Sequence, residues 1–359
     1  MKLSFNLLFS IAFLISHIQS YAINRNEYYG IYPDDEGFVM VYTIEGFYAK
    51  IYSSQNIAIL EHTPEGKPVY SGKIVIPDSV SFIDDRNILR AVPVMSIGDA
   101  FVGSDIEELT LNHFISNIDI PAFMGCSKLR VLDTSPTSSI TLGYRALCAS
   151  GLENIIWSDT VCIVNQALTG LPKLRHIDLS LKSVTLGDYA LDGSSVDSLL
   201  LPGDCTLYEG CFDGDNSIAN LIFIGSDVSD YNRQQLLGKG ALAGFKSLKT
   251  LSCQWGIPPI IDENINIGDN GEPTDIFKRC ELIVPMEYIS NYRSAPGWRN
   301  FKNIHGVLYA DFIETDPVIV RTEYFDLSGR QLERPTQGFI IRRDIMSNNT
   351  IHTSPIIIW

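Results

Sequence analysis

One pattern of residues returns seven times through the middle of this chain and constrains its fold more than any other feature. Each copy has the spacing L-x-x-L-x-L, and the copies start at Ile106, Leu129, Leu152, Leu174, Val196, Ile218 and Leu248. The steps between them are 23, 23, 22, 22, 22 and 30 residues. A small residue followed by an apolar one comes six or seven residues earlier, at Ala100-Phe101, Ala122-Phe123, Ala146-Leu147, Ala167-Leu168, Ala190-Leu191, Cys211-Phe212 and Ala241-Leu242. A fixed period in the twenties predicts a solenoid of stacked repeats.

The spacing also predicts which side chains face the core. The last two apolar positions of L-x-x-L-x-L alternate, so we expect both to point inward from a short strand while the residues between them face solvent. One repeat cannot bury its own inward row, whereas stacked repeats bury it against their neighbours. Glycines shortly after the small-apolar pair mark turns where a positive φ is tolerated, at Gly103, Gly125, Gly170, Gly193, Gly214 and Gly244.

These motifs resemble the BspA-like leucine-rich repeat family of secreted and surface proteins. The resemblance covers roughly residues 94 to 306, and its most specific pieces are "SIGDAFVGSDIEELTL", "IPAFMGCSKLRVLD" and "CELIVPMEYISNYRSAPGWRNFKNI". The last piece is similar to the closing unit of the family, in which a strand precedes an aromatic-bearing helix. The resemblance implies adhesion or ligand capture, and it brings no catalytic residues with it.

The regions on either side of the repeats differ from them in composition. Residues 1–22 have Lys2, an apolar core from Leu7 to Ile15, and small residues Ser20 and Ala22 before the expected cleavage point, which predicts a signal peptide. Residues 23–93 are rich in Tyr and β-branched residues and predict a β-rich N-terminal cap, with a degenerate first repeat at Lys73 to Val80. Residues 94–306 are the repeats with their terminal cap.

Residues 307–359 predict a small C-terminal β module. "EYFDLSGRQLERPTQGFIIRR" is typical of three strands separated by turns. It resembles the sorting domain of type IX secretion at Tyr324, Asp326, Gly329, Arg330 and Gly338. The ending "NNTIHTSPIIIW" departs from that pattern, so a structural end piece is the alternative.

Charge and composition exclude several classes of function. The formal net charge is −15, and removal of residues 1–22 would take away only Lys2 and leave −16. Such a field repels phosphate backbones and anionic lipid, so we expect no nucleic-acid partner. No later segment has 18 consecutive apolar residues, so we expect no integral membrane segment in the mature chain.

The sequence offers no arrangement of residues typical of an enzyme or a cofactor site. There is no G-x-S-x-G, H-E-x-x-H or phosphate-binding loop, and the six histidines are scattered. The seven cysteines have no C-x-x-C spacing and are interpreted as core residues, with one or two disulfides left open. Trp298 could stack on a sugar, but core burial is the favoured interpretation. We therefore expect neither catalysis nor a cofactor.

An acidic insertion near the end of the repeats raises the question of calcium. It carries Asp262, Glu263, Asp269, Glu272 and Asp275, whose oxygens could hold Ca²⁺. The spacing matches no EF-hand, so a solvated loop is the favoured interpretation.

The best candidate for binding is the outward face of the repeat strands. One predicted row runs through Glu108, Val131, Asn154, His176, Ser198, Asn220 and Thr250, and the second through Thr110, Asp133, Ile156, Asp178, Leu200, Ile222 and Ser252. Ile156, Leu200 and Ile222 are apolar where water is expected. With Asp133, His176 and Asp178 they form a mixed face suited to a protein or glycan partner. The alternative is that a loop, an insertion or a dimer mate covers these residues.

These observations predict an exported, non-enzymatic leucine-rich repeat protein, extracellular or on the outer-membrane surface, that mediates adhesion or ligand capture. A structural spacer without a ligand and a hydrolase with a dispersed site are the alternatives. The sequence leaves the ligand's identity and the oligomeric state open.

Overall fold

The computed structural model describes most of the chain from residue 38 onward. The described ranges are 38–52, 55–62, 70–119, 122–164, 166–208, 210–214, 217–225, 237–267, 271–308, 319–326, 330–332, 338–346 and 351–358. The chain divides into two compact units, Met1–Phe38 and Val39–Trp359, and the described residues other than Phe38 belong to the second. The predicted signal peptide at 1–22 lies outside the described residues. No helix among the described residues is long and apolar enough to cross a bilayer.

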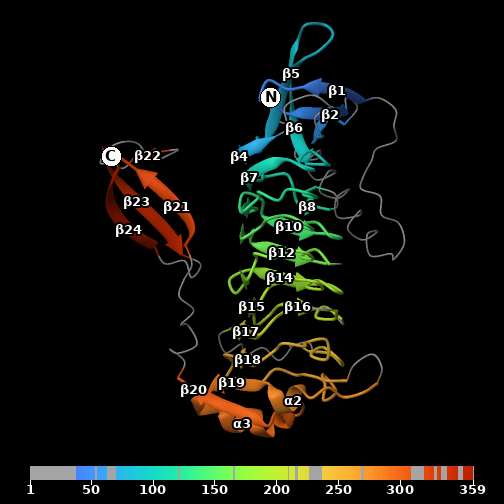
Figure 1. Ribbon diagram of the computed structural model, residues 1–359, viewed down its shortest axis with the longest axis vertical. Coiled ribbons are helices and arrows are strands. Elements are labelled where there is room, and N and C mark those ends of the chain that lie inside the picture. The colour runs from blue at the N-terminus through green and yellow to red at the C-terminus, as the bar shows by residue number, and fades with distance from the viewer. Residues whose placement is uncertain are drawn as a thin grey trace. The chain divides into compact units, whose positions relative to one another are not determined.

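The first strands of the repeats form two parallel sheets, which follow one another along the chain (Figure 1). One sheet has the order β11-β9-β7-β4. Its strands are β4 (Ser71–Val75), β7 (Asp105–Thr110), β9 (Val131–Asp133) and β11 (Asn154–Ile156). The next has the order β13-β15-β17-β18-β19-β20. Its strands are β13 (His176–Asp178), β15 (Ser198–Pro202), β17 (Asn220–Ile224), β18 (Thr250–Cys253), β19 (Glu281–Pro285) and β20 (Asn303–Val307).

A second strand in each repeat forms a separate five-stranded sheet of order β16-β14-β12-β10-β8. The strands are β8 (Asn117–Ile118), β10 (Ser139–Leu142), β12 (Thr160–Ile163), β14 (Ser183–Leu186) and β16 (Thr206–Leu207). All four pairings in it are parallel. Each described repeat from 105 to 207 therefore contributes one strand to a first-strand sheet and one to the second-strand sheet.

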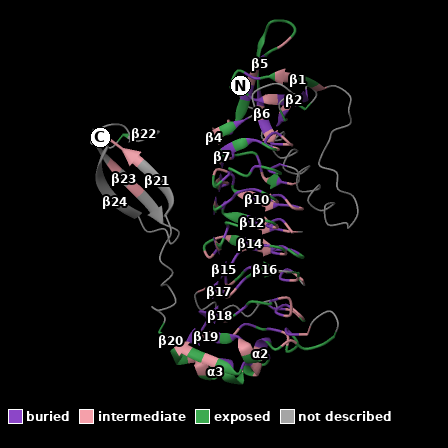
Figure 2. Ribbon diagram, viewed as in Figure 1, coloured by how far each residue is buried: buried purple, intermediate pink, exposed green. Residues whose placement is uncertain are grey.

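The apolar positions that define the repeat are the core of the fold. The residues at the last two positions of each L-x-x-L-x-L copy have at most 7% of their surface exposed, which confirms the prediction that they point inward. The residues that begin the seven copies are buried as well. The small-apolar pairs are also buried, and the rings of Phe101 and Phe123 stack with centroids 6.3 Å apart. Figure 2 shows the buried residues along the repeat strands. The hydrophobic ladder is continuous because each repeat completes the burial of the one before it.

The turns after the small-apolar pairs use the left-handed backbone region. Gly103, Gly125, Gly170, Gly193 and Gly214 have positive φ, as predicted. Gly244 does not, and the prediction was wrong there. Gly244 is instead needed because it has no side chain and the backbone of Phe212 approaches it closely. A Cβ at Gly244 would lie 2.4 Å from the carbonyl oxygen of Phe212.

The residues before the repeats form a sheet of order β1-β2-β3-β6-β5. Its strands are β1 (Phe38–Tyr42), β2 (Tyr48–Tyr52), β3 (Ile57–Leu60), β5 (Ser79–Ile83) and β6 (Leu89–Ser96). β4 instead pairs in parallel with β7, with Ile74 opposite Leu109. The expected degenerate repeat therefore contributes its strand to the sheet of the regular ones.

The closing unit has four short helices, one before β19 and three between β19 and β20. They are α2 (Ile276–Arg279), η1 (Met286–Tyr288), α3 (Ile289–Ser294) and η2 (Trp298–Asn300). Trp298 is fully buried, its indole N–H donates to the carbonyl of Pro259 at 2.8 Å, and its ring meets Tyr292 edge-on at 5.3 Å. Trp298 is thus a core residue, and a sugar-stacking role for it is ruled out by its burial.

The C-terminal residues form their own antiparallel sheet of order β22-β21-β23-β24. Its strands are β21 (Ile319–Phe325), β22 (Gln331–Leu332), β23 (Gly338–Met346) and β24 (Ile351–Ile358). The three predicted strands are present, and the divergent ending adds a fourth. Pro355 is accommodated because β24 is an edge strand, where the missing N–H can face away from the sheet.

Candidate functional site

The predicted binding rows are described first by their strand register. In one block Glu108, Val131 and Asn154 lie side by side, and in the next His176, Ser198, Asn220 and Thr250 do. The second row has Thr110, Asp133 and Ile156 in the first block, and Asp178, Leu200, Ile222 and Ser252 in the second. We call the outward side chains of these two rows the first-strand face.

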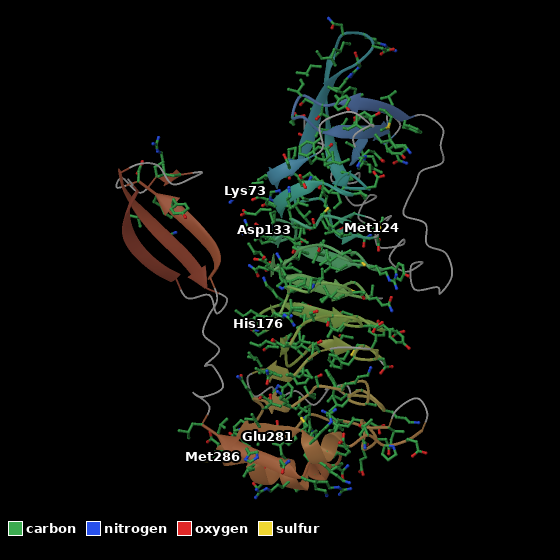
Figure 3. All side chains as sticks on the ribbon, in the orientation of Figure 1. Lys73, Met124, Asp133, His176, Glu281 and Met286 are labelled. Carbon is green, nitrogen blue, oxygen red and sulfur yellow. The ribbon has the colours of Figure 1, made fainter. Side chains whose placement is uncertain are left out.

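The face is interrupted in its middle. Among the described residues no pairing joins β11 to β13, although the second-strand sheet continues across the same repeats through β12 and β14. The six candidate residues therefore fall into two groups. Asp133 and Ile156 lie before the break, and His176, Asp178, Leu200 and Ile222 lie after it. Figure 3 labels Asp133 and His176 along one side of the stacked strands.

The two acidic candidates are held in the same way. Asp133 Oδ1 accepts from the backbone N–H and hydroxyl of Ser135 at 3.0 and 2.7 Å. Asp178 Oδ1 accepts from the N–H and hydroxyl of Ser180 at 3.0 and 2.6 Å. These D-x-S turns fix each carboxylate at the end of its strand, so both present a defined negative charge on a half-buried face.

Burial separates the three apolar candidates. Ile156 and Ile222 are half-buried, as outward residues on a strand should be. Leu200 is only 4% exposed, so the prediction that it faces solvent was wrong. Leu199, Leu200, Leu201 and Pro202 are all buried, which means that the chain itself covers both sides of β15 there. Ser252 in the same row is also buried, so the alternative of internal cover holds for this part of the face.

The start of the face carries paired charges. Lys73 Nζ lies 2.9 Å from Glu108 Oε2, and Arg130 lies 3.8 Å from the other oxygen of Glu108. Asn220 accepts from the Thr250 hydroxyl at 2.8 Å further along the same row. Three residues of the first row, Glu108, Asn220 and Thr250, thus have partners on neighbouring strands. Exposed pairs of this kind contribute about 0–1 kcal/mol each to stability.

The acidic insertion shows little sign of a calcium site. Glu263 pairs with Arg299 at 3.3 Å, Asp275 pairs with Arg279 at 2.9 Å, and Asp262 accepts from the N–H of Asn264 at 2.7 Å. Asp269 lies outside the described residues. In the part of the chain that is described, no three His, Cys, Asp or Glu residues come together as metal ligands would.

Five of the seven cysteines are core residues, whereas Cys148 and Cys162 are half-buried, so the core interpretation was wrong for those two. All seven are free thiols, so neither of the disulfides left open by the sequence is formed. Burial raises the pKa of Cys205 and of Cys280 to about 12, and it raises the pKa of Cys211 and Cys253 as well. A thiolate nucleophile is therefore disfavoured at these positions.

A second outward face escaped the sequence reasoning. The outward positions of the second-strand sheet are Asn117, Ser139, Thr141, Thr160, Cys162, Ser183, Thr185 and Thr206, and each is half-buried or exposed. We call them the second-strand face. The signal that could have found it is the recurring S/T-x-T/C of "SITL", "TVCI" and "SVTL", one copy a repeat.

Comparison with known families supports the repeat assignment over part of the chain. Residues 96–223 match the model of the BspA type leucine rich repeat region in six copies. The match is shorter than the 94–306 expected from the resemblance, and it ends within the 30-residue step from Ile218 to Leu248. Comparison with curated proteins gave no match. The repeats are of the kind that suggests a binding role.

Proposed function

We propose that this chain is an exported, non-enzymatic leucine-rich repeat solenoid that binds a protein or glycan through the first-strand face. The observation that carries the proposal is the in-register placement of Asp133 beside Ile156, with a half-buried apolar side chain next to a fixed carboxylate. Mixed apolar and polar surfaces of this kind are typical of interaction sites.

Export and surface location are part of the proposal. They rest on the pattern of residues 1–22 and on the C-terminal module. In that module Asp326 and Arg330, two residues of the sorting-domain resemblance, bond to each other between β21 and β22. Arg330 N donates to Asp326 Oδ1 at 3.0 Å, and its guanidinium donates to Oδ2 at 3.2 Å. We propose that the module directs sorting by a type IX route.

The spacer alternative draws on the covered positions Leu200 and Ser252, since a face that the chain covers cannot bind a partner there. The hydrolase alternative has no observation in its favour among the described residues. A binding face and a spacer differ in one measurable way. Substitution of the outward residues abolishes capture of a partner only if the face binds one.

The experiment is a pull-down with the full chain from host-surface and bacterial-surface extracts, beside an Ile156→Asp/Ile222→Asp variant. Leu200 stays unchanged because a buried aspartate would unfold β15. The matched control is Ile83→Asp/Leu89→Asp, two exposed apolar residues on the β5–β6 hairpin. All variants must keep the wild-type circular dichroism spectrum and melting temperature.

Capture of a protein by the wild type and the control, and its loss in the face variant, supports the proposal. Equal capture by all three proteins would contradict the assignment to the first-strand face. No capture by any of them in repeated extracts would favour the spacer.

A further inference from the structure

The second-strand face carries two rows of side chains that bear hydroxyl groups at every strand position except Cys162. In the first row Ser139, Thr160 and Ser183 lie side by side on β10, β12 and β14. In the second row Thr141, Cys162, Thr185 and Thr206 follow one another, beginning beside Asn117. Figure 1 shows these strands one after another along the repeats.

Several other Ser and Thr side chains of the repeats bond to a neighbouring repeat, whereas the hydroxyls of this face have no such bond within the described part of the chain. Thr134, Ser158 and Thr169 each bond to a neighbouring repeat. No side-chain hydrogen bond from the six hydroxyls of the second-strand face to the described part of the chain is found. Their hydrogen-bonding capacity is therefore directed outward.

An aromatic ring stands at the end of the same face. Tyr208 follows Thr206 by two residues, and its N–H donates to the Leu186 carbonyl at 3.0 Å, which continues the ladder of β14 and β16 by one residue. Alternation along the strand places its ring on the side of Thr206. The ring is 53% exposed.

The charge of the face selects the partner. The two rows between Ser139 and Thr206 contain no charged side chain. Carboxylates border them at Asp119, Asp159 and Asp204, and the whole chain carries −15. Lys182, which precedes Ser183, is paired with Asp159 at 3.4 Å. An uncharged ligand that both donates and accepts hydrogen bonds complements this surface, whereas an anionic one meets repulsion.

The spacing of the rows gives the form of the ligand. Neighbouring strands lie about 4.8 Å apart, and residues two apart on one strand lie about 6.6 Å apart. The first distance is close to the length of one sugar in an extended chain, and the second is close to the width of its ring. A chain laid across the strands, one sugar per repeat, would meet hydroxyls on both edges at β10 and β14 and on one edge at β12 and β16, with Tyr208 available to stack on a ring face.

We propose that the second-strand face binds an uncharged, extended β-linked polysaccharide laid across β10, β12, β14 and β16. This site is separate from the first-strand face, and the two proposals succeed or fail independently.

The test is affinity electrophoresis of the full chain in gels containing mixed-linkage β-glucan, with alginate as the anionic counterpart. The main variant is Thr141→Val/Thr185→Val/Thr206→Val, because Val keeps the β-branched shape and removes only the hydroxyl. Thr110→Val, the same change on the first-strand face, is its matched control. Tyr208→Ala is compared with Tyr189→Ala, since Tyr189 is similarly exposed in the turn after β14.

We expect β-glucan to retard the wild type, Thr110→Val and Tyr189→Ala. The triple variant should bind at least tenfold more weakly, Tyr208→Ala should also bind more weakly, and alginate should retard none of the proteins. The Ile156→Asp/Ile222→Asp variant should keep wild-type retardation, which separates this site from the first-strand face. Absence of retardation of the wild type, an undiminished affinity in a triple variant with wild-type melting, or stronger retardation by alginate would each overturn the proposal.

Discussion

The carboxyl group of Glu61, which follows β3, faces that of Asp99, which follows β6 at the first repeat turn. Asp99 Oδ1 accepts from the backbone N–H of His62 at 2.9 Å, which holds the two residues together. The pKa of Glu61 is raised to about 7. Burial is the largest cause of this rise and the neighbouring Asp99 carboxyl is the next, while the Lys50 ammonium acts in the opposite direction. The folded protein therefore holds a proton at Glu61 that the unfolded chain releases.

This pair predicts a pH-dependent effect of Glu61→Gln. The pKa is raised on folding, so the contribution of Glu61 to stability is full below about pH 4.5 and is lost as the pH rises to about 7. Gln imitates the protonated form at every pH. We expect the variant to match the wild type near pH 4 and to exceed its free energy of unfolding by about 1–2 kcal/mol at pH 8, a value below the full shift because Glu61 is half-buried.

Urea unfolding at intervals from pH 4 to 8.5 measures this difference. Glu107→Gln on β7 is the matched control, because Glu107 is exposed and its nearest cation, Arg130, lies 3.7 Å away. A constant difference between Glu61→Gln and the wild type across the range would contradict the prediction.

Ala149 predicts a stabilising substitution. It lies at the turn position that other repeats fill with glycine, and its φ is 57°. A left-handed conformation costs an L-residue with a Cβ about 1 kcal/mol. Ala149→Gly should therefore raise the free energy of unfolding by about 0.5–1 kcal/mol. Ala146→Gly, three residues earlier and without positive φ, should lower it. A loss of stability in Ala149→Gly in denaturant titrations would show that the turn is not strained.

Much of the fold could be predicted because the repeat imposes it at many positions at once. The inward positions of the repeats from Ile106 to Leu248 could be predicted because the inward row of one repeat is buried only when the neighbouring repeats place theirs against it. Positive φ also occurs one residue before the small-apolar pair in three repeats, at Arg145, Gln166 and Tyr189. The residue types at these positions do not predict that conformation. Their conformation is set by bonds between turns, such as Gln166 N–H to the Tyr189 carbonyl at 3.0 Å.

The candidate site was predictable only in part. Alternation gave the correct register of Asp133 and Ile156, because one side of β9 and β11 is open. It failed at Leu200, because alternation indicates direction along a strand and carries no information about cover from elsewhere in the chain. The gap between β11 and β13 has no signature either, since the steps on both sides are 22 or 23 residues.

Trp255 predicts that two glycines are required for packing. A Cβ at Gly203 or Gly225 would lie 2.4 or 2.6 Å from the Trp255 indole nitrogen, and the ring of Phe223 lies 5.4 Å from that of Trp255. Gly225→Ala should lower the free energy of unfolding by about 1–3 kcal/mol through overpacking. Trp255→Phe should destabilise less in the Gly225→Ala background than in the wild type.

A double-mutant cycle from urea denaturation measures this coupling. Gly46→Ala is unsuitable as a control because of its positive φ, whereas Gly238→Ala meets no atom within 4 Å and should be near neutral. Additive effects of Gly225→Ala and Trp255→Phe would show that the indole does not depend on the glycine.

Truncation to alanine should have a large effect on stability at Leu200 and a small one at Ile156, although both residues belong to the second row. Leu200→Ala removes a side chain that is 4% exposed and should lower the free energy of unfolding by about 2–4 kcal/mol. Ile156→Ala removes a half-buried side chain and should cost less than about 1.5 kcal/mol, while reducing capture of any partner of the first-strand face. If Leu200→Ala proves as mild as Ile156→Ala in urea unfolding, β15 is open to solvent and Leu200 returns to the candidate binding residues. A large cost at Leu200 with unaltered binding leaves Ile156 and Ile222, on either side of the gap between β11 and β13, as the accessible apolar residues of the second row.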